Sequence, residues 1–297
     1  MRLLAGPPAY NAAVLAGLML IALAAVSWGT TGSVATMLVQ HHGAEPLLIG
    51  IGRVVVAAAL LLAAAGLGGA PLVVARADLG RCLLMGACLA AYQAAYFTAV
   101  VMTGIAVAAL LAICSAPLMI ATLAVALLGE RLTVRIAAAL GLGVAGTALL
   151  VAGPAGGLAP GPRLVAGASL ALAAGLAYAI YVIVAKVSLA RSAPLPLTAL
   201  TFTAAALIML PGLAGSTVPL DQVARGWPWL LYLGGVATAG AYAVYALGLR
   251  RVPASMAGTV TLLEPLTATL LGVLVFGEPL GAIGGLGALT LLGAIGL

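Results

Sequence analysis

The chain has very little charge. Only 6% of its 297 residues are Asp, Glu, Lys or Arg, against about 25% in an ordinary soluble domain. Apolar types make up 65%, and the mean hydropathy is +1.28. One membrane-spanning helix needs ~20 apolar residues, so the chain has enough for about ten. This composition excludes a cytosolic enzyme, a secreted disulfide scaffold and a disordered chain.

Residue types that carry redox or metal chemistry are also scarce. Cys82, Cys88 and Cys114 lie in or beside apolar runs without a CxxC spacing, which predicts small buried hydrophobes. The two histidines, His41 and His42, are adjacent, and neighbouring residues do not face one metal from a helix. The sequence therefore predicts no metal, no cofactor and no enzymatic activity.

The excess of positive charge indicates membrane topology. The net charge is +6, but the basic residues are scattered singly between apolar runs, which argues against a nucleic-acid partner. Most of them fall in alternate links between the helices, nine against two, and this bias predicts that both termini are cytoplasmic. The nine are Arg2, Arg76, Arg81, Arg131, Arg135, Lys186, Arg191, Arg250 and Arg251, and the two are Arg163 and Arg225.

The apolar runs, separated by charges, Gly and Pro, predict an all-α polytopic membrane protein with ten helices. Membrane lipid is therefore an expected partner, and the expected location is the bacterial inner membrane. The ranges are 12–39, 47–66, 81–101, 103–128, 132–152, 164–189, 195–214, 229–249, 255–276 and 280–297.

An internal repeat divides the ten helices into two halves. Pro117 with Gly129-Glu130 recurs as Pro265 with Gly277-Glu278, at an offset of 148 residues. The units are residues 1–152 and 153–297, with five helices each. Because five is odd, the second unit must enter the membrane from the opposite side, and inverted repeats of this kind are typical of secondary transporters.

These residues also carry a family resemblance. Trp28-Gly29, Arg53, Tyr96-Phe97, Pro117…Gly129-Glu130 and Leu263-Glu264-Pro265…Gly277-Glu278 resemble the EamA-type family of the drug/metabolite transporter superfamily. The resemblance implies ten helices around a central cavity, lined mainly by helices 1, 3, 4, 6, 8 and 9. It also implies export of amino acids or related metabolites, as by aromatic amino-acid exporters. One departure is Ala116 before Pro117, where the second half has Glu264.

Aromatic residues are few, fourteen in all, yet many lie inside helices that should line the cavity. A Tyr hydroxyl facing lipid would lack a hydrogen-bond partner, so these faces should point inward. Helix packing is one interpretation and an aromatic substrate pocket is the other. The residues predicted to bind substrate are Trp28, Tyr92, Gln93, Tyr96, Tyr178, Tyr181, Tyr242, Tyr245 and Glu264.

Ionisable residues inside predicted spans are candidates for function. Glu264 could bind a substrate amine or carry a proton, beside a kink expected at Pro265; Pro117 and Pro265 are the predicted hinges. Arg53 is expected to have a structural role, paired with Glu45 or reaching the outer headgroups. Glu130 and Glu278 are predicted to bond to a neighbouring hairpin as structural residues.

Small-residue stripes, such as Ala137, Gly141 and Ala145, predict close helix packing inside the protein or a dimer face. Internal packing and a monomer are favoured.

The sequence as a whole predicts a secondary transporter that exports amino acids and related small metabolites by alternating access. A carrier of drug-like cations or sugars is the alternative, and a channel is a further one.

Overall fold

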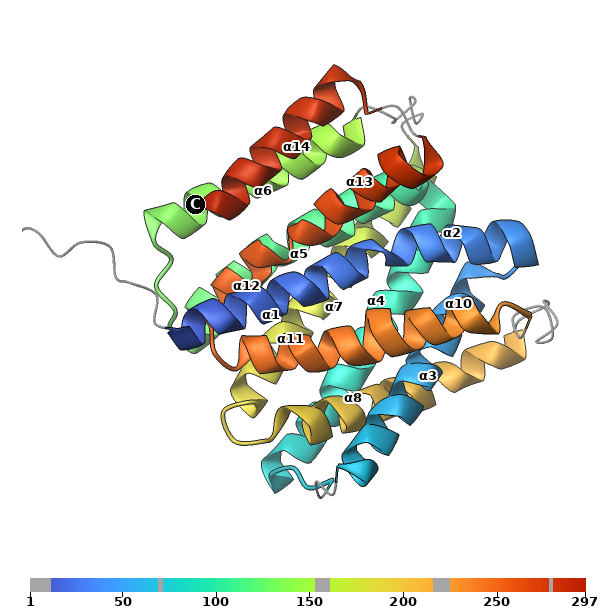
Figure 1. The fold of residues 1–297 in the computed structure, drawn as a ribbon, viewed down its shortest axis with the longest axis vertical. Helices are drawn as coiled ribbons and strands as arrows, with labels where there is room; N and C mark the ends of the chain where they lie inside the picture. The colour runs from blue at the N-terminus through green and yellow to red at the C-terminus, as the bar shows by residue number, and fades with distance from the viewer. Residues whose placement is uncertain (1–11, 69–71, 153–160, 216–224, 278–279) are drawn as a thin grey trace, which may run out of the picture.

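The computed structural model describes residues 12–68, 72–152, 161–215, 225–277 and 280–297, and these form helices without a strand (Figure 1). The elements are α1 (Ala12–Gly29), α2 (Thr31–His42), α3 (Pro46–Leu67), α4 (Arg76–Thr103), α5 (Ile105–Leu128), α6 (Val134–Ala152), α7 (Pro162–Ser188), α8 (Pro194–Met209), η1 (Leu210–Gly215), α10 (Trp227–Leu231), η2 (Tyr232–Gly240), α11 (Ala241–Leu249), α12 (Ala254–Val260), α13 (Leu263–Phe276) and α14 (Gly281–Gly296).

Eight helical segments of the described residues are long and apolar enough to cross a membrane. Two more apolar helices, Val134–Leu150 and Gly281–Gly296, are shorter. At 1.5 Å per residue, a 16-residue helix is about 24 Å long, less than the ~30 Å hydrocarbon core. Many large apolar side chains lie on the outside, among them Leu274 at 78% exposure. The chain is therefore a multi-pass α-helical membrane protein, and the ten-span topology stays a prediction.

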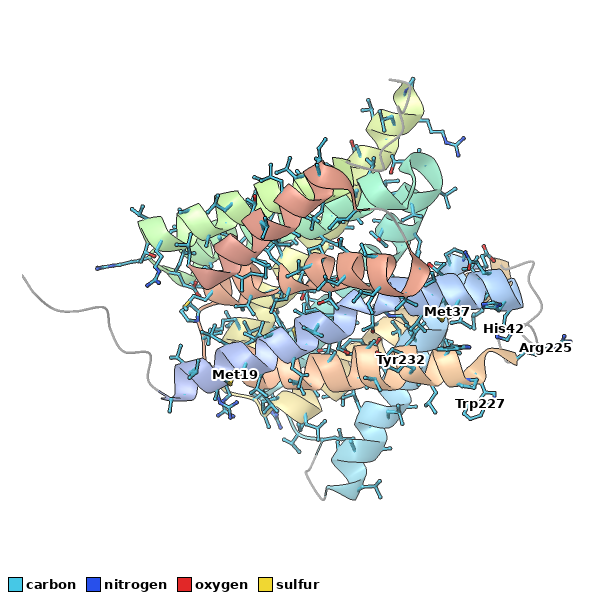
Figure 2. All side chains as sticks on the ribbon, turned by 45° about the horizontal axis from the view of Figure 1, so that its top comes forward. Met19, Met37, His42, Arg225, Trp227 and Tyr232 are labelled. Atoms are coloured by element: carbon cyan, nitrogen blue, oxygen red, sulfur yellow. The ribbon has the colours of Figure 1, made fainter. Side chains whose placement is uncertain are left out.

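The helices pack as neighbours in space that are distant in sequence. In Figure 1, α6 and α14 lie side by side at one edge, and α3 and α8 lie toward the opposite edge. Between them, α4 packs on α7 and α1 packs on α11. Figure 2 shows Met19 at one end of the molecule and His42, Arg225 and Trp227 at the other.

Three predicted helices are interrupted. The first breaks at Thr30, between α1 and α2, and the ninth breaks at Thr261-Leu262, between α12 and α13. The second break has a clear cause, because Pro265 lacks the N–H that would bond to the carbonyl of Thr261 four residues earlier. Glu264 N donates to that carbonyl instead, at 2.9 Å. The eighth contains a π-helical segment, η2, in which Thr238 Oγ1 donates to Leu233 O at 2.6 Å.

Glycines on α6 and α14 bring these helices into backbone contact. A Cβ on Gly146 would lie 2.9 Å from Gly287 O, and a Cβ on Gly287 would lie 2.7 Å from Gly146 O. The predicted internal stripe is wrong, because Ala137, Gly141 and Ala145 are all exposed. The stripe lies on one face of α6, and the packed glycines lie on another.

Polar contacts tie together the links at one end of the molecule. Lys186 Nζ donates to Leu249 O at 2.8 Å and to Val252 O at 2.6 Å, so α7 caps the end of α11. The carboxylate of Glu130, after α5, accepts hydrogen bonds from Ala254 N at 2.7 Å and Ser255 N at 3.1 Å, at the start of α12. Both contacts satisfy backbone groups that helix ends leave free.

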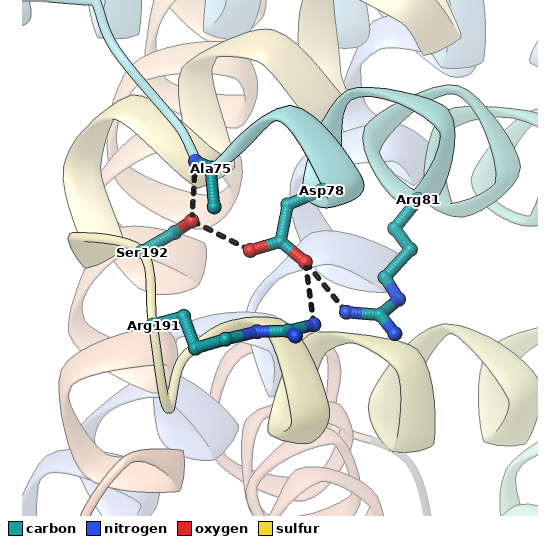
Figure 3. Close-up of polar contacts among 5 residues, drawn as sticks. All are labelled: Ala75, Asp78, Arg81, Arg191 and Ser192. Atoms are coloured by element: carbon teal, nitrogen blue, oxygen red, sulfur yellow. Dashed lines mark hydrogen bonds and ion pairs between the residues drawn. The ribbon is translucent and has the colours of Figure 1, made fainter.

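A second tie at these links surrounds Asp78, a residue that the sequence analysis did not single out (Figure 3). Its side chain is fully buried, and Oδ1 accepts from Arg81 Nη1 at 2.7 Å and Arg191 Nη2 at 3.4 Å. Ser192 Oγ donates to Oδ2 at 2.7 Å and accepts from Ala75 N at 3.2 Å. The start of α4 is thereby joined to the link between α7 and α8.

We expect Asp78→Asn to lower stability by about 1.5 to 3 kcal/mol, the usual contribution of hydrogen bonds to a charged group. The loss stays moderate because Arg81 and Arg191 are 33% and 49% exposed and remain hydrated. Thermal unfolding in detergent measures it. Ser192→Ala removes hydrogen bonds but no charge and should cost less; an equal or larger loss would contradict a role for the carboxylate charge.

Candidate substrate-binding site

Aromatic rings from three helical segments, α1, α7 and α11, meet around Trp28, near the end of α1. Its ring centroid lies 4.8 Å from that of Tyr242, 5.2 Å from that of Tyr245 and 6.3 Å from that of Tyr178. These separations are those of favourable ring pairs. Trp28, Tyr242 and Tyr245 are 6%, 6% and 0% exposed, so the contacts form the protein interior.

The cluster extends along α4 and α7. Tyr92 and Tyr96, four residues apart, stack with centroids 5.8 Å apart and an interplanar angle of 4°. The ring centroid of Tyr178 lies 5.9 Å from that of Tyr92 and 5.8 Å from that of Tyr181. The helical spacing that favoured inward faces therefore corresponds to rings in mutual contact.

Sequence reasoning missed one member of this cluster. Phe202, on α8, lies 4.8 Å from Tyr242 between ring centroids and is 2% exposed. The predicted helix that contains it, residues 195–214, was not expected to line the cavity. Phe202 is the one aromatic residue in that apolar run, and this was the feature of the sequence that could have indicated its role.

Several polar atoms in the same region are buried without a partner among the described residues. They are donors, or hydroxyls that can donate: Trp28 Nε1, Arg53 Nε, Gln93 Nε2, Tyr178 Oη and Tyr245 Oη. The hydroxyls of Tyr178 and Tyr245 are near each other, but without the geometry of a hydrogen bond. Buried polar groups are normally paired, so this concentration marks a place where a ligand or water can bind.

Arg53 and Gln93 line one void together with Tyr92, Thr238, Phe202 and Tyr242. A Cβ on Gly50 would lie 3.4 Å from Gln93 Nε2, which places that amide against α3 one turn before Arg53. Nε of Arg53 is buried without a partner, and the side chain lines this void. The expectation that Arg53 reaches the outer headgroups stays a prediction, since the side chain is partly exposed.

Glu264 follows the break in the ninth helix and lies beside the cluster. Its backbone oxygen would be 2.7 Å from a Cβ on Gly29, the residue after Trp28. Its carboxylate interacts electrostatically with Arg53, Tyr92 and Tyr178. The site therefore holds one acidic residue, Glu264, and one basic residue, Arg53, beside the aromatic cluster.

The expected central cavity is closed in this conformation. The void lined by Arg53 and Gln93 measures about 10 Å³, about the space of one water molecule. Sites for small molecules usually measure ~300 Å³ or more. A substrate can enter only when the rings move apart.

The remaining predicted residues lie elsewhere. Pro117 lies inside the unbroken α5, in contrast with Pro265 beside a break. Glu130 lies at the tied end of the molecule, and Glu278 lies outside the described residues. No group of three His, Cys, Asp or Glu in the described part of the chain could hold a metal ion.

Comparisons with known proteins agree with this architecture. The pattern of the EamA-like transporter family matches residues 15–152 and again residues 165–297. The chain is 36% identical to "Uncharacterized transporter YwfM" of Bacillus subtilis (strain 168), over 93% of this chain and 92% of the relative. It is 32% identical to an "Uncharacterized transporter" of Archaeoglobus fulgidus, over 63% of this chain and 64% of the relative.

The fold also resembles a solved one. A crystal structure matches with a TM-score of 0.82 at 22% identity and covers 94% of each chain. With its apolar helices and its two family matches, the chain belongs to the EamA-like transporter family. It is a membrane transporter of the drug/metabolite transporter type.

Proposed function

We propose that the protein is a secondary transporter that exports amino acids and related small metabolites across the bacterial inner membrane. The observation that carries this proposal is the aromatic cluster around Trp28, with Arg53 and Glu264 beside it. Stacked rings accept varied apolar side chains, and the two charges match the two charged groups of an amino acid. The protein is proposed to act as a monomer and without a cofactor.

Alternating access by two inverted halves, residues 1–152 and 153–297, is the proposed mechanism. In this scheme α7 is the counterpart of α1, and α11 is the counterpart of α4. The packing of α4 on α7 and of α11 on α1 supports it, because an inverted repeat relates these two contacts. Gly129 and Gly277 further support it, since both end their helices at φ 66° and ψ 22°.

The site draws residues from both halves, which suits a carrier that opens to each side in turn. Trp28, Tyr92 and Tyr96 come from the first half, and Tyr178 and Tyr242 from the second. Relative motion of the halves would separate these rings and expose the site. Pro265, beside the break after α12, is a proposed bending point, and Pro117 within α5 is a second.

Both termini are proposed to be cytoplasmic. The ties made by Asp78, Glu130 and Lys186 gather four links at one end of the molecule. These links and the helix ends beside them contain eight of the nine basic residues that set the predicted orientation, the ninth being Arg2. The positive-inside rule assigns this end to the cytoplasm.

Purified protein in liposomes preloaded with unlabelled amino acids tests the transport proposal. We expect saturable, counterflow-driven uptake of labelled amino acids, aromatic and other hydrophobic ones included. Trp28→Ala should lower it strongly, whereas Trp227→Ala, at an aromatic residue that is 63% exposed, should retain it. Absence of counterflow for every amino acid refutes the substrate class, and non-saturating flux without counterflow indicates a channel.

Drug-like organic cations are the second candidate substrates, favoured by Glu264 within an aromatic enclosure. Cations bind to ring faces and to carboxylates. Inhibition of amino-acid counterflow by tetraphenylphosphonium, together with uptake of that cation, would favour this alternative.

A further inference from the structure

We propose that Arg53 and Gln93 form the subsite for the carboxylate of the transported molecule, and that Glu264 binds its ammonium group. The site would then select zwitterionic α-amino acids over the corresponding amines and acids. This inference rests on the proposed function and assigns the recognition of each end of the substrate.

One buried donor of each residue lacks an acceptor in the described part of the chain. Gln93 is 5% exposed, and its Nε2 is buried without a partner, as is Nε of Arg53. Both side chains line the same void. A guanidinium group has five N–H donors and no acceptor, and it binds carboxylates through two parallel hydrogen bonds. A carboxylate supplies the acceptors that both residues need.

The other residues that line the void do not supply an acceptor for the buried donors of Arg53 and Gln93, so a bound carboxylate can do so. Thr238 donates its hydroxyl to Leu233 O within η2, so it does not satisfy the arginine. Phe202 and Tyr242 supply apolar ring surface. The void has space for about one water, which the carboxylate would displace as the rings move apart.

Arg53 and Glu264 lie near the same aromatic cluster without pairing directly. They interact electrostatically but form no direct ion pair, unlike Arg81 and Asp78 in the described part of the chain. Both charges act on Tyr92 and Tyr96. A cation and an anion beside one ring cluster are complementary to a zwitterion whose side chain stacks on those rings.

Three ligands that share the same phenyl side chain test the assignment. They are phenylalanine, phenethylamine, which lacks the carboxylate, and 3-phenylpropionate, which lacks the amine. Their affinities are measured on the full-length protein in detergent by quenching of tryptophan fluorescence. Arg53→Gln should weaken phenylalanine and phenylpropionate by about 10- to 100-fold and leave phenethylamine unchanged. Glu264→Gln should weaken phenylalanine and phenethylamine and leave phenylpropionate unchanged.

Matched variants separate recognition from folding. Arg135→Gln, on an exposed face of α6, should change none of the three affinities. Gln93→Leu removes the second donor without altering charge and should weaken the two carboxylate ligands alone, by roughly 3- to 10-fold. It keeps the proposal testable if Arg53→Gln does not fold.

The outcomes distinguish this inference from the proposed function. Equal weakening of all three ligands by Arg53→Gln, or unchanged phenylpropionate affinity, overturns the carboxylate subsite even if amino acids are transported. Loss of phenylpropionate affinity in Arg53→Gln, in a protein without amino-acid counterflow, supports the subsite and refutes the amino-acid function. Failure of the wild type to bind any of the three ligands overturns both assignments.

Discussion

Gly146→Ala is expected to disrupt the packing of α6 on α14. The added Cβ would lie 2.8 Å from Leu291 N and 2.9 Å from Gly287 O, which are backbone atoms that no rotamer change can move. Overpacking of this kind costs about 1 to 3 kcal/mol, and here the two helices must separate to relieve it. Thermal unfolding in detergent, followed by size-exclusion chromatography, should give a clearly lower midpoint.

The same helix offers a control. Gly141 is exposed, and a Cβ placed there meets nothing within 4 Å. Gly141→Ala should keep or raise the midpoint, since alanine favours the helix by about 1 kcal/mol. Equal midpoints for the two variants would show that the backbone contact between α6 and α14 does not hold the fold together.

Glu264→Gln is expected to reduce amino-acid counterflow by at least about tenfold, because the substitution keeps the shape and removes the only negative charge beside the aromatic cluster among the described residues. The loss of one charge-assisted hydrogen bond accounts for a factor of this size. The initial rate of counterflow into liposomes, at several values of external pH, is the measurement. An unchanged rate with an unchanged pH profile would exclude both amine binding and proton coupling at this residue.

Thr269→Val is the matched control for this prediction. Thr269 lies on the same helix, α13, and its hydroxyl donates to Pro265 O within that helix. This replacement is similar in shape and leaves the charge of the site unaltered, so transport should persist. Strong loss in both variants would indicate that α13 tolerates little change and would remove the specific argument for the carboxylate.

Much of the membrane architecture is determined by local sequence. Apolar runs bounded by Pro, Gly and charges identified the eight long apolar helical segments and the two shorter ones of the described residues, because a helix in lipid must satisfy its own backbone and needs a minimum length. The breaks at Thr30 and at Thr261-Leu262 were harder to predict from the sequence. Pro265 indicated a kink, but Pro117, in a similar local sequence, lies in an unbroken helix, so proline alone does not decide the geometry.

The candidate site was only partly visible in the sequence. Tyrosines within spans were predicted to face inward, because a hydroxyl has no partner in lipid. The burial of Asp78, the membership of Phe202 and the position of Arg53 depended on contacts between helices that are far apart in the chain. The mistaken stripe on α6 has the same cause, since spacing gives the face of a helix but not which face meets a neighbour.

The shortage of charge and the long apolar runs by themselves determined that this chain is a polytopic membrane protein, because the lipid environment selects directly on composition. Tertiary structure decided which residues share the interior. Only the packing of α1, α3, α4, α7, α11 and α13 brings an arginine, a glutamine and a glutamate to one cluster of rings. The unpaired donors of Arg53 and Gln93 arise from that convergence, and no local pattern in the sequence encodes it.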